Sequence, residues 1–136
     1  MKVKVKVHID KRAMGLIHNE IQEALLETAD AIKSDLVQSQ TMPFGNDTTK
    51  EAKERGYVAG NLQNRSTYVK KELRKNRVKI VSDTPYARRL YYHPEYNFYQ
   101  GHNSKAGGKW FDPYIDGKKK RYAQNVFSRK LKEKLK

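Results

Sequence analysis

The sequence predicts a single α+β domain, in which a long N-terminal amphipathic helix packs on a small antiparallel sheet and a second helix closes the chain. Three patterns support this fold class: alternating valines at the N-terminus, apolar residues at helical spacing through 13–38, and two short β-type runs between 66 and 82. The chain has 136 residues, the length of one ordinary domain, so we expect one domain over 1–136.

The N-terminal segment is predicted to be a strand. Val3, Val5, Val7 and Ile9 alternate with lysines and a histidine, which is typical of a strand with one buried and one solvated face.

The next segment, 13–38, is predicted to be one long amphipathic helix. Its apolar positions recur every three or four residues, and its acidic residues lie elsewhere on the helical wheel. The positions expected to face the core are Met14, Ile17, Ile21, Leu25, Thr28 or Ala29, Ile32 and Leu36.

Residues 39–64 lose this periodicity and collect glycine, proline and asparagine. They predict a long loop or arm, with a short helix around Thr48–Arg55. Connections of this length are usually functional or disordered, so we expect an arm that becomes ordered against a neighbouring subunit.

A β-hairpin is predicted next, with strands over Ser66–Leu73 and Arg77–Ser82 joined by a turn at 74–76. Alternation places Val78, Ile80 and Ser82 on one face, and Lys79 and Val81 on the other. Pro85 then ends the second strand, because proline lacks a backbone donor.

The region after the hairpin is the most aromatic part of the chain, with six of its fourteen aromatic residues between Tyr86 and Tyr99. We expect a short helix over Ala87–Tyr92 that stops at His93–Pro94, then an irregular excursion over 93–109. A final amphipathic helix is predicted over 119–135, with inward residues Tyr122, Val126, Phe127, Leu131 and Leu135.

Composition excludes several classes of protein. Only 37% of residues are hydrophobic, and no apolar run approaches the roughly 20 residues that span a bilayer, so we expect neither a membrane partner nor a signal peptide. The chain has no cysteine, which excludes disulfides and thiolate zinc sites. The four histidines lack metal-ligand spacing and no nucleotide-binding fingerprint is present, so we expect no metal and no cofactor.

The net charge of +14 is concentrated in blocks. Residues 65–79 contain seven basic residues and one acid, and residues 118–136 contain nine and one, whereas 13–64 contains four basic residues and eight acids. This pattern suits either nucleic acid or contacts between oppositely charged faces of neighbouring subunits. A solvated helix face is the simplest explanation of the C-terminal block.

The residues of the aromatic region also fit two other kinds of site. His93 with Glu95, or His102 with Asn103 and Lys105, has the residue types of a small nuclease. Tyr91, Tyr92, Tyr96 and Tyr99 beside Arg88 and Arg89 have those of a single-strand-binding groove. Tyrosine and arginine are equally typical of protein interfaces, and we favour an interface here.

Three motifs, taken in order, carry a family resemblance. Gly60, Leu62 and Ser66 precede the hairpin, Tyr86 and Ala87 follow it with Arg88, Leu90, Tyr91 and Tyr92, and Trp110 with Phe111 comes before the last helix. The order resembles that in the minor capsid and head–tail joining proteins of long-tailed bacteriophages. That family has a G-x-L-x-x-S-like segment before a hairpin, a YA motif after it and an aromatic-proline element before the C-terminal helix. Here the first motif is one residue longer than the common spacing.

The resemblance covers about residues 10–136 and implies a function. It implies a non-enzymatic virion protein of the neck or tail-completion region, which joins the DNA-filled head to the tail as a homo-oligomeric ring of six subunits. Its implied partners are neighbouring head-completion and tail proteins and the double-stranded DNA in the lumen, and its implied location is the virion neck, with host cytoplasm during assembly. The alternatives are a basic DNA- or RNA-binding module using 65–79 and 118–136, and a small nuclease.

Overall fold

A computed structural model describes residues 3–7 and 18–135. The chain divides into two compact units, each assembled from three separate stretches. The loop unit contains Met1–Val3, Leu36–Tyr68 and Ser82–Trp110, and the helix–sheet unit contains Lys4–Asp35, Val69–Val81 and Phe111–Lys136. Because both units draw on widely separated parts of the chain, no single cut separates them. The expectation of one domain over 1–136 stays a prediction.

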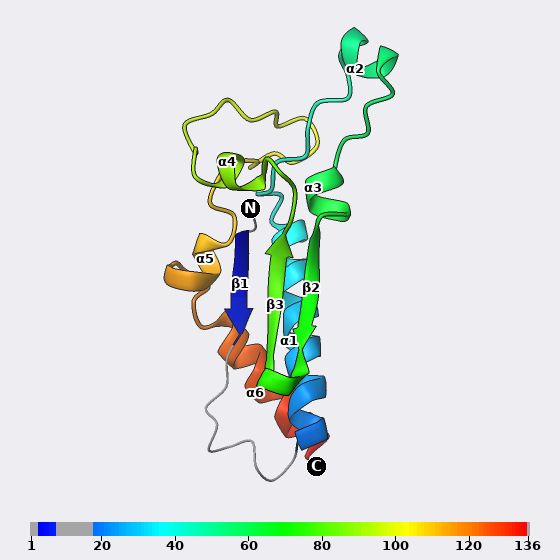
Figure 1. The fold of residues 1–136 in the computed structure, drawn as a ribbon. Helices are drawn as coiled ribbons and strands as arrows, with labels where there is room; N and C mark the ends of the chain where they lie inside the picture. The colour runs from blue at the N-terminus through cyan, green and yellow to red at the C-terminus, as the bar shows by residue number, and fades with distance from the viewer. Residues whose placement is uncertain (1–2, 8–17, 136) are drawn as a thin grey trace. The chain divides into compact units, whose positions relative to one another are not determined.

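The helix–sheet unit contains most of a three-stranded sheet in the order β1-β3-β2. Its strands are β1 (Val3–Val7), β2 (Thr67–Glu72) and β3 (Arg77–Ser82), and neighbouring strands run in opposite directions (Figure 1). A 3₁₀ turn over Leu73–Lys75 and a left-handed Asn76 (φ 52°) connect β2 to β3. The predicted hairpin is therefore confirmed. The predicted N-terminal strand is confirmed over Val3–Val7, and Ile9 lies outside the described residues.

The central strand differs from the predicted alternation in one respect. Every residue from Val78 to Ser82 is buried, including Lys79, so both faces of β3 are covered. An antiparallel sheet commonly leaves one face in water, so the burial of Lys79 and Val81 shows that the second face of β3 is covered as well.

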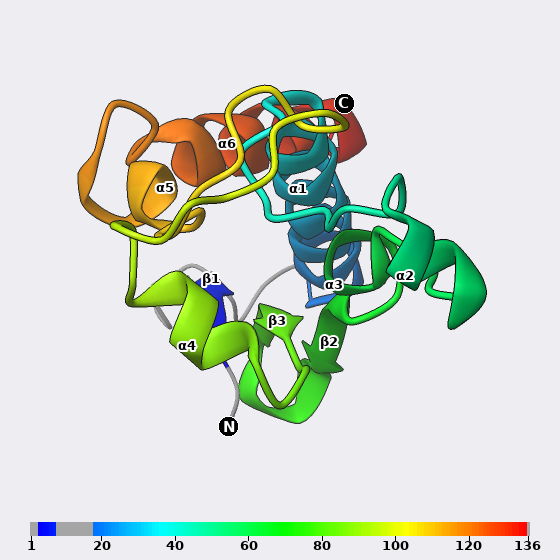
Figure 2. The ribbon, with the colours of Figure 1, turned by 90° about the horizontal axis from the view of Figure 1, so that it is seen from above.

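Helix α1 (His18–Gln38) supplies more of the described apolar core of the helix–sheet unit than any other element. Figure 2 shows α1 and α6 (Tyr122–Lys134) on the same side of the sheet. The predicted helix and its buried face are confirmed over the described part of 13–38; residues 13–17 lie outside it. The side chains that it buries in this unit are Ile21, Ala24, Leu25, Thr28, Ala29 and Ile32.

The C-terminal helix is present but buries less than predicted. Of the five residues expected to face inward, only Val126 is fully buried; Tyr122, Phe127 and Leu131 are half-buried, and Leu135 is 48% exposed. Leu135 is the C-cap of α6, and the last turn of a helix has fewer neighbours to cover it. The short helix α5 (Asp112–Asp116), with Pro113 in its first turn, was not predicted.

The loop unit contains little regular structure beyond three short helices. These are α2 (Lys50–Glu54), α3 (Asn61–Asn64) and α4 (Ala87–Tyr91), and the predicted helices around Thr48–Arg55 and Ala87–Tyr92 correspond to α2 and α4. The expected long loop over 39–64 is thus partly helical. Among the described residues, no helix is long and apolar enough to cross a membrane.

The two ends of the predicted arm differ sharply. Backbone N–H groups of Lys105 and Gly107 donate to the carbonyl oxygens of Gln40 and Thr41, so the start of the arm is paired with the predicted excursion. Met42 is completely buried there. In contrast, α2 buries none of its residues and projects away from α3 and α4 (Figure 1).

Candidate interface of the loop unit

An apolar cavity of about 290 Å³ opens in the loop unit. We call it the aromatic groove, because rings from three parts of the chain supply most of its walls. Leu62 and Leu90 add aliphatic surface, and the edges carry Asn61 and Asn97. The aromatic residues that line it are Phe44, Tyr57, Tyr86, Phe98 and Tyr99.

Gly60 joins the two ends of the projecting loop, residues 45–59, at Phe44, which lines the groove. Its N–H donates to the carbonyl oxygen of Phe44 at 2.6 Å, and its φ is +86°, in the left-handed region that favours glycine. A Cβ at this position would lie only 2.6 Å from the Phe44 ring. The first residue of the family-like motif is therefore a backbone requirement in this fold.

The other two residues of that motif have structural roles nearby. Leu62 is buried on the groove wall. The Ser66 hydroxyl accepts a hydrogen bond from the Asn61 side chain at 3.3 Å, and the Ser66 carbonyl accepts one from the Asp83 N–H at 2.7 Å. Ser66 thus connects the first residue of α3 to the residue after β3.

Three residues of the second and third family-like motifs are buried in the loop unit: Ala87, Tyr91 and Trp110. The rings of Tyr91 and Trp110 meet edge to face, with centroids 4.8 Å apart. The Trp110 indole N–H donates to the Ser82 hydroxyl at 3.3 Å, and that hydroxyl also bonds Thr67 at 2.8 Å. Half of the predicted motif is therefore core.

Of the remaining motif residues, Tyr86, Arg88 and Tyr92 are exposed, and Leu90 is half-buried. Tyr86 is exposed, and its hydroxyl accepts a hydrogen bond from the Asn61 side chain at 3.4 Å. Tyr92 is 54% exposed, with the Arg88 guanidinium carbon 6.0 Å and the Lys109 ammonium 5.7 Å from its ring centroid. We call Arg88, Tyr92 and Lys109 the tyrosine–cation cluster. Phe111, the last predicted motif residue, is buried in the helix–sheet unit.

The two histidines of the nuclease alternative each pair with a carboxylate at the surface. His93 Nδ1 lies 2.6 Å from Glu95, and its ring stacks on Tyr96 at 4.7 Å. His102 Nε2 lies 2.8 Å from Asp47, a contact that lowers the pKa of Asp47. Asn103, grouped with His102 in the sequence, is instead buried: its amide donates to the Met42 carbonyl and the Gln63 side chain, both at 2.8 Å. This corrects the predicted grouping, because Asn103 faces the interior.

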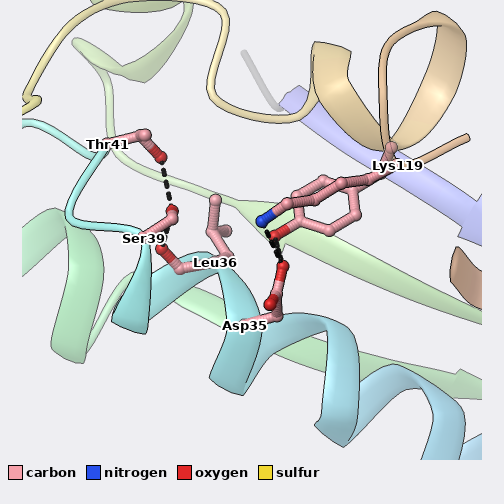
Figure 3. A network of polar contacts seen from close by, with 6 residues as sticks. Asp35, Leu36, Ser39, Thr41 and Lys119 are labelled. Atoms are coloured by element: carbon pink, nitrogen blue, oxygen red, sulfur yellow. Dashed lines mark hydrogen bonds and ion pairs between the residues drawn. The ribbon is translucent and has the colours of Figure 1, made fainter.

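Part of the C-terminal basic block is bound to acids of α1 in the helix–sheet unit. Lys119 Nζ donates to Asp35 at 2.6 Å, as does the Tyr114 hydroxyl (Figure 3). Burial acts to raise the pKa of Asp35, but the two hydrogen bonds outweigh it and the pKa is lowered. At the other end, Lys134 contacts both Glu23 and Glu27, so α6 runs antiparallel to α1. Figure 3 also shows a contact within the loop unit, where the Ser39 hydroxyl donates to the Leu36 carbonyl oxygen and is hydrogen-bonded to the Thr41 hydroxyl.

The basic hairpin block is also partly neutralised within its own unit. Glu72 accepts from Lys79 at 2.5 Å and from Arg77 at 2.7 Å. The Lys79 hydrogen bond has the largest effect and, with Arg77, lowers the pKa of Glu72 to about 2. The exposed cations of this block are Arg65, Lys70, Lys71, Arg74 and Lys75.

Sequence reasoning missed the residues that give the loop unit its shape. Phe44 and Tyr57 lie in a segment predicted as unstructured, yet both line the groove, and the Tyr57 hydroxyl occupies the space that a Cβ on Gly45 would need. The available signal in the sequence was the glycines at 45, 56 and 60. All three have a positive φ in the structure, which is typical of a loop with defined turns. Within 3–7 and 18–135, no three histidine or acidic side chains gather in a way suited to a metal ion. Searches of protein-family models, curated proteins and solved structures found no match to this chain.

Proposed function

We propose that this chain is a structural virion protein of the phage head–tail connection, a neck or tail-completion component that joins the DNA-filled head to the tail. It acts as a homo-oligomeric ring of six subunits around double-stranded DNA, bound to neighbouring head-completion and tail proteins. It is non-enzymatic, assembles in the host cytoplasm and resides in the virion neck.

The observation that carries the proposal is the uncovered aromatic surface of the loop unit. Tyr57, Val58 and Tyr86 are exposed, and Tyr57 and Tyr86 also line the aromatic groove. Exposed apolar patches beside a cavity mark protein interaction sites, and tyrosine is among the residues that contribute most to interfaces. The projecting loop adds a second argument, because α2 buries nothing within its own chain.

The order of the family-like motifs supports the phage assignment specifically. Gly60, Ala87 and Trp110 occupy positions where the fold needs a left-handed residue, a fully buried small side chain and a buried ring. Tyr86, an exposed member that lines the groove, is available to a neighbouring protein. A motif divided in this way between core and surface is expected of a subunit that must fold first and assemble afterwards.

The first test is the mass of the purified protein by light scattering after size exclusion, at about 100 mM and about 500 mM salt, with absorbance at 260 nm recorded. A nucleic-acid-free ring at both salts is expected, with negative-stain images showing its symmetry. A monomer that releases nucleic acid at high salt supports the basic binding module instead. A monomer at both salts in the presence of candidate head and tail proteins contradicts the proposal.

A pair of matched variants tests which surface is used. Val58→Glu places a charge directly after Tyr57, a groove residue, at a position where the native side chain is 59% exposed. Ile115→Glu makes the same change at a 56% exposed site in the helix–sheet unit. We expect V58E to lose the oligomer and I115E to retain it, with both variants folded by circular dichroism. If V58E retains the oligomer and I115E loses it, the interface does not lie at the aromatic groove.

A further inference from the structure

We infer that the tyrosine–cation cluster is a binding site for single-stranded nucleic acid, with Tyr92 stacking on a base and Arg88 and Lys109 contacting the adjacent phosphates. The site is separate from the aromatic groove, and the inference does not require the ring. Of the four tyrosines in the groove predicted from the sequence, Tyr92 alone remains in this site. Tyr91 is buried, Tyr96 is stacked against His93, and Tyr99 lines the separate aromatic groove.

The first argument is that the Tyr92 ring is exposed but held rigidly. It meets the Tyr91 ring edge-on, with centroids 5.1 Å apart, and Tyr91 is fixed in turn by Trp110. Over half of Tyr92 stays accessible to solvent. A ring that is already oriented loses little conformational freedom when a base stacks on it.

The second argument is the backbone geometry that brings Lys109 to this ring. Lys109 has a φ of 52°, a left-handed conformation that is unfavourable for a long side chain, and its N–H donates to the Tyr91 carbonyl at 3.0 Å. Gly108 makes this approach possible, since a Cβ there would come within 2.9 Å of the carbonyl oxygens of Leu90 and Tyr91. Strained backbone of this kind is concentrated at functional sites.

The third argument is charge. Arg88 and Lys109 lie within about 6 Å of the Tyr92 ring, and Arg89 on the same helix is exposed. An acidic peptide would satisfy the cations and leave the ring uncovered, and duplex DNA keeps its bases stacked out of reach. A single strand offers phosphates and accessible bases together.

The test is fluorescence anisotropy with a labelled oligothymidylate of about 12 nucleotides, an abasic strand of the same length and a duplex. Tyr92→Ala is expected to weaken oligothymidylate binding about tenfold, as loss of one stacked base predicts, with little change for the other two probes. Tyr92→Phe keeps the ring and should bind like the wild type. Ile115→Ala, which removes a side chain about as exposed as Tyr92 from the helix–sheet unit, is the matched control.

The cations need their own comparison, because a chain of net charge +14 binds any polyanion to some extent. Lys109→Ala should weaken oligothymidylate binding more than Lys70→Ala, which removes an equal exposed charge from the hairpin. The inference is overturned if Y92A affects all three probes equally, if Y92F also fails, or if polyglutamate competes as well as oligothymidylate. Light scattering on each variant separates this outcome from failure of the ring proposal.

Discussion

The two units of this chain are stabilised in different ways. The helix–sheet unit relies on the apolar face of α1 and the buried strand β3, with ion pairs such as Lys119–Asp35 linking its elements. The loop unit has only short helices, and its backbone is held by a buried ring and by directional hydrogen bonds to side chains such as Asn103. The first arrangement tolerates polar substitutions at its surface, whereas the second depends on individual polar groups.

The largest effect is expected from Trp110→Ala in the loop unit. Loss of this buried ring removes the partner of Tyr91 and leaves a cavity, at a cost of about 3–5 kcal/mol. Amide hydrogen exchange should show loss of protection first at α4 and at residues 103–107. Equal loss of protection along α1 and α4 would show that the two units unfold as one.

The next effect is expected from Asn103→Ala. This change leaves the Met42 carbonyl and the Gln63 side-chain oxygen buried without their donor, so we expect the free energy of unfolding to fall by about 1–3 kcal/mol. Urea titration followed by Trp110 fluorescence measures it. Asn97→Ala, which removes an exposed amide from the same excursion, should stay within about 0.5 kcal/mol of the wild type. Similar losses for both would mean that burial of the Asn103 amide is unimportant.

A smaller effect, of opposite sign, is expected from Lys109→Gly. Relief of the left-handed conformation should raise the free energy of unfolding by about 1 kcal/mol, while removal of the cation weakens single-strand binding. Lys105→Gly is the control, at an exposed position without positive φ, and should not raise the free energy of unfolding. A K109G protein no more stable than the wild type would show that Lys109 carries no backbone strain.

The smallest effect is a change in how stability depends on pH, in the helix–sheet unit. The pKa of Glu72 is lowered to about 2 from 4.5, so its ion pairs stabilise the folded chain fully above pH 4.5 and progressively less as the pH falls toward 2. Between pH 5 and pH 2, the thermal midpoint of Glu72→Gln should therefore fall less steeply than that of the wild type, because the variant lacks the carboxylate that titrates in this range. Parallel curves for the two proteins would assign the acid sensitivity to other carboxylates.

The sequence predicted the helix–sheet unit better than the loop unit, because periodicity reports burial only in regular elements. The spacing of Ile21, Leu25 and Ile32 fixes the inner face of α1, and the valine alternation fixes β1. No periodic signal connects Met42 to Asn103, whose contact spans 61 residues. The sequence also did not predict which motif residues are buried and which are exposed. Tyr91 and Tyr92 are adjacent in the sequence, yet Tyr91 is buried and Tyr92 is exposed.

The hydrogen bond from Gly60 to Phe44 has a practical consequence for protein engineering. It closes residues 45–59 as a self-contained loop whose two ends already meet, and the space around Gly56 at its tip is empty for 4 Å in the direction of a side chain. Loops with fixed, adjacent ends accept changes of length at modest entropic cost. A peptide tag inserted at Gly56 is therefore expected to leave the fold of the rest of the loop unit intact.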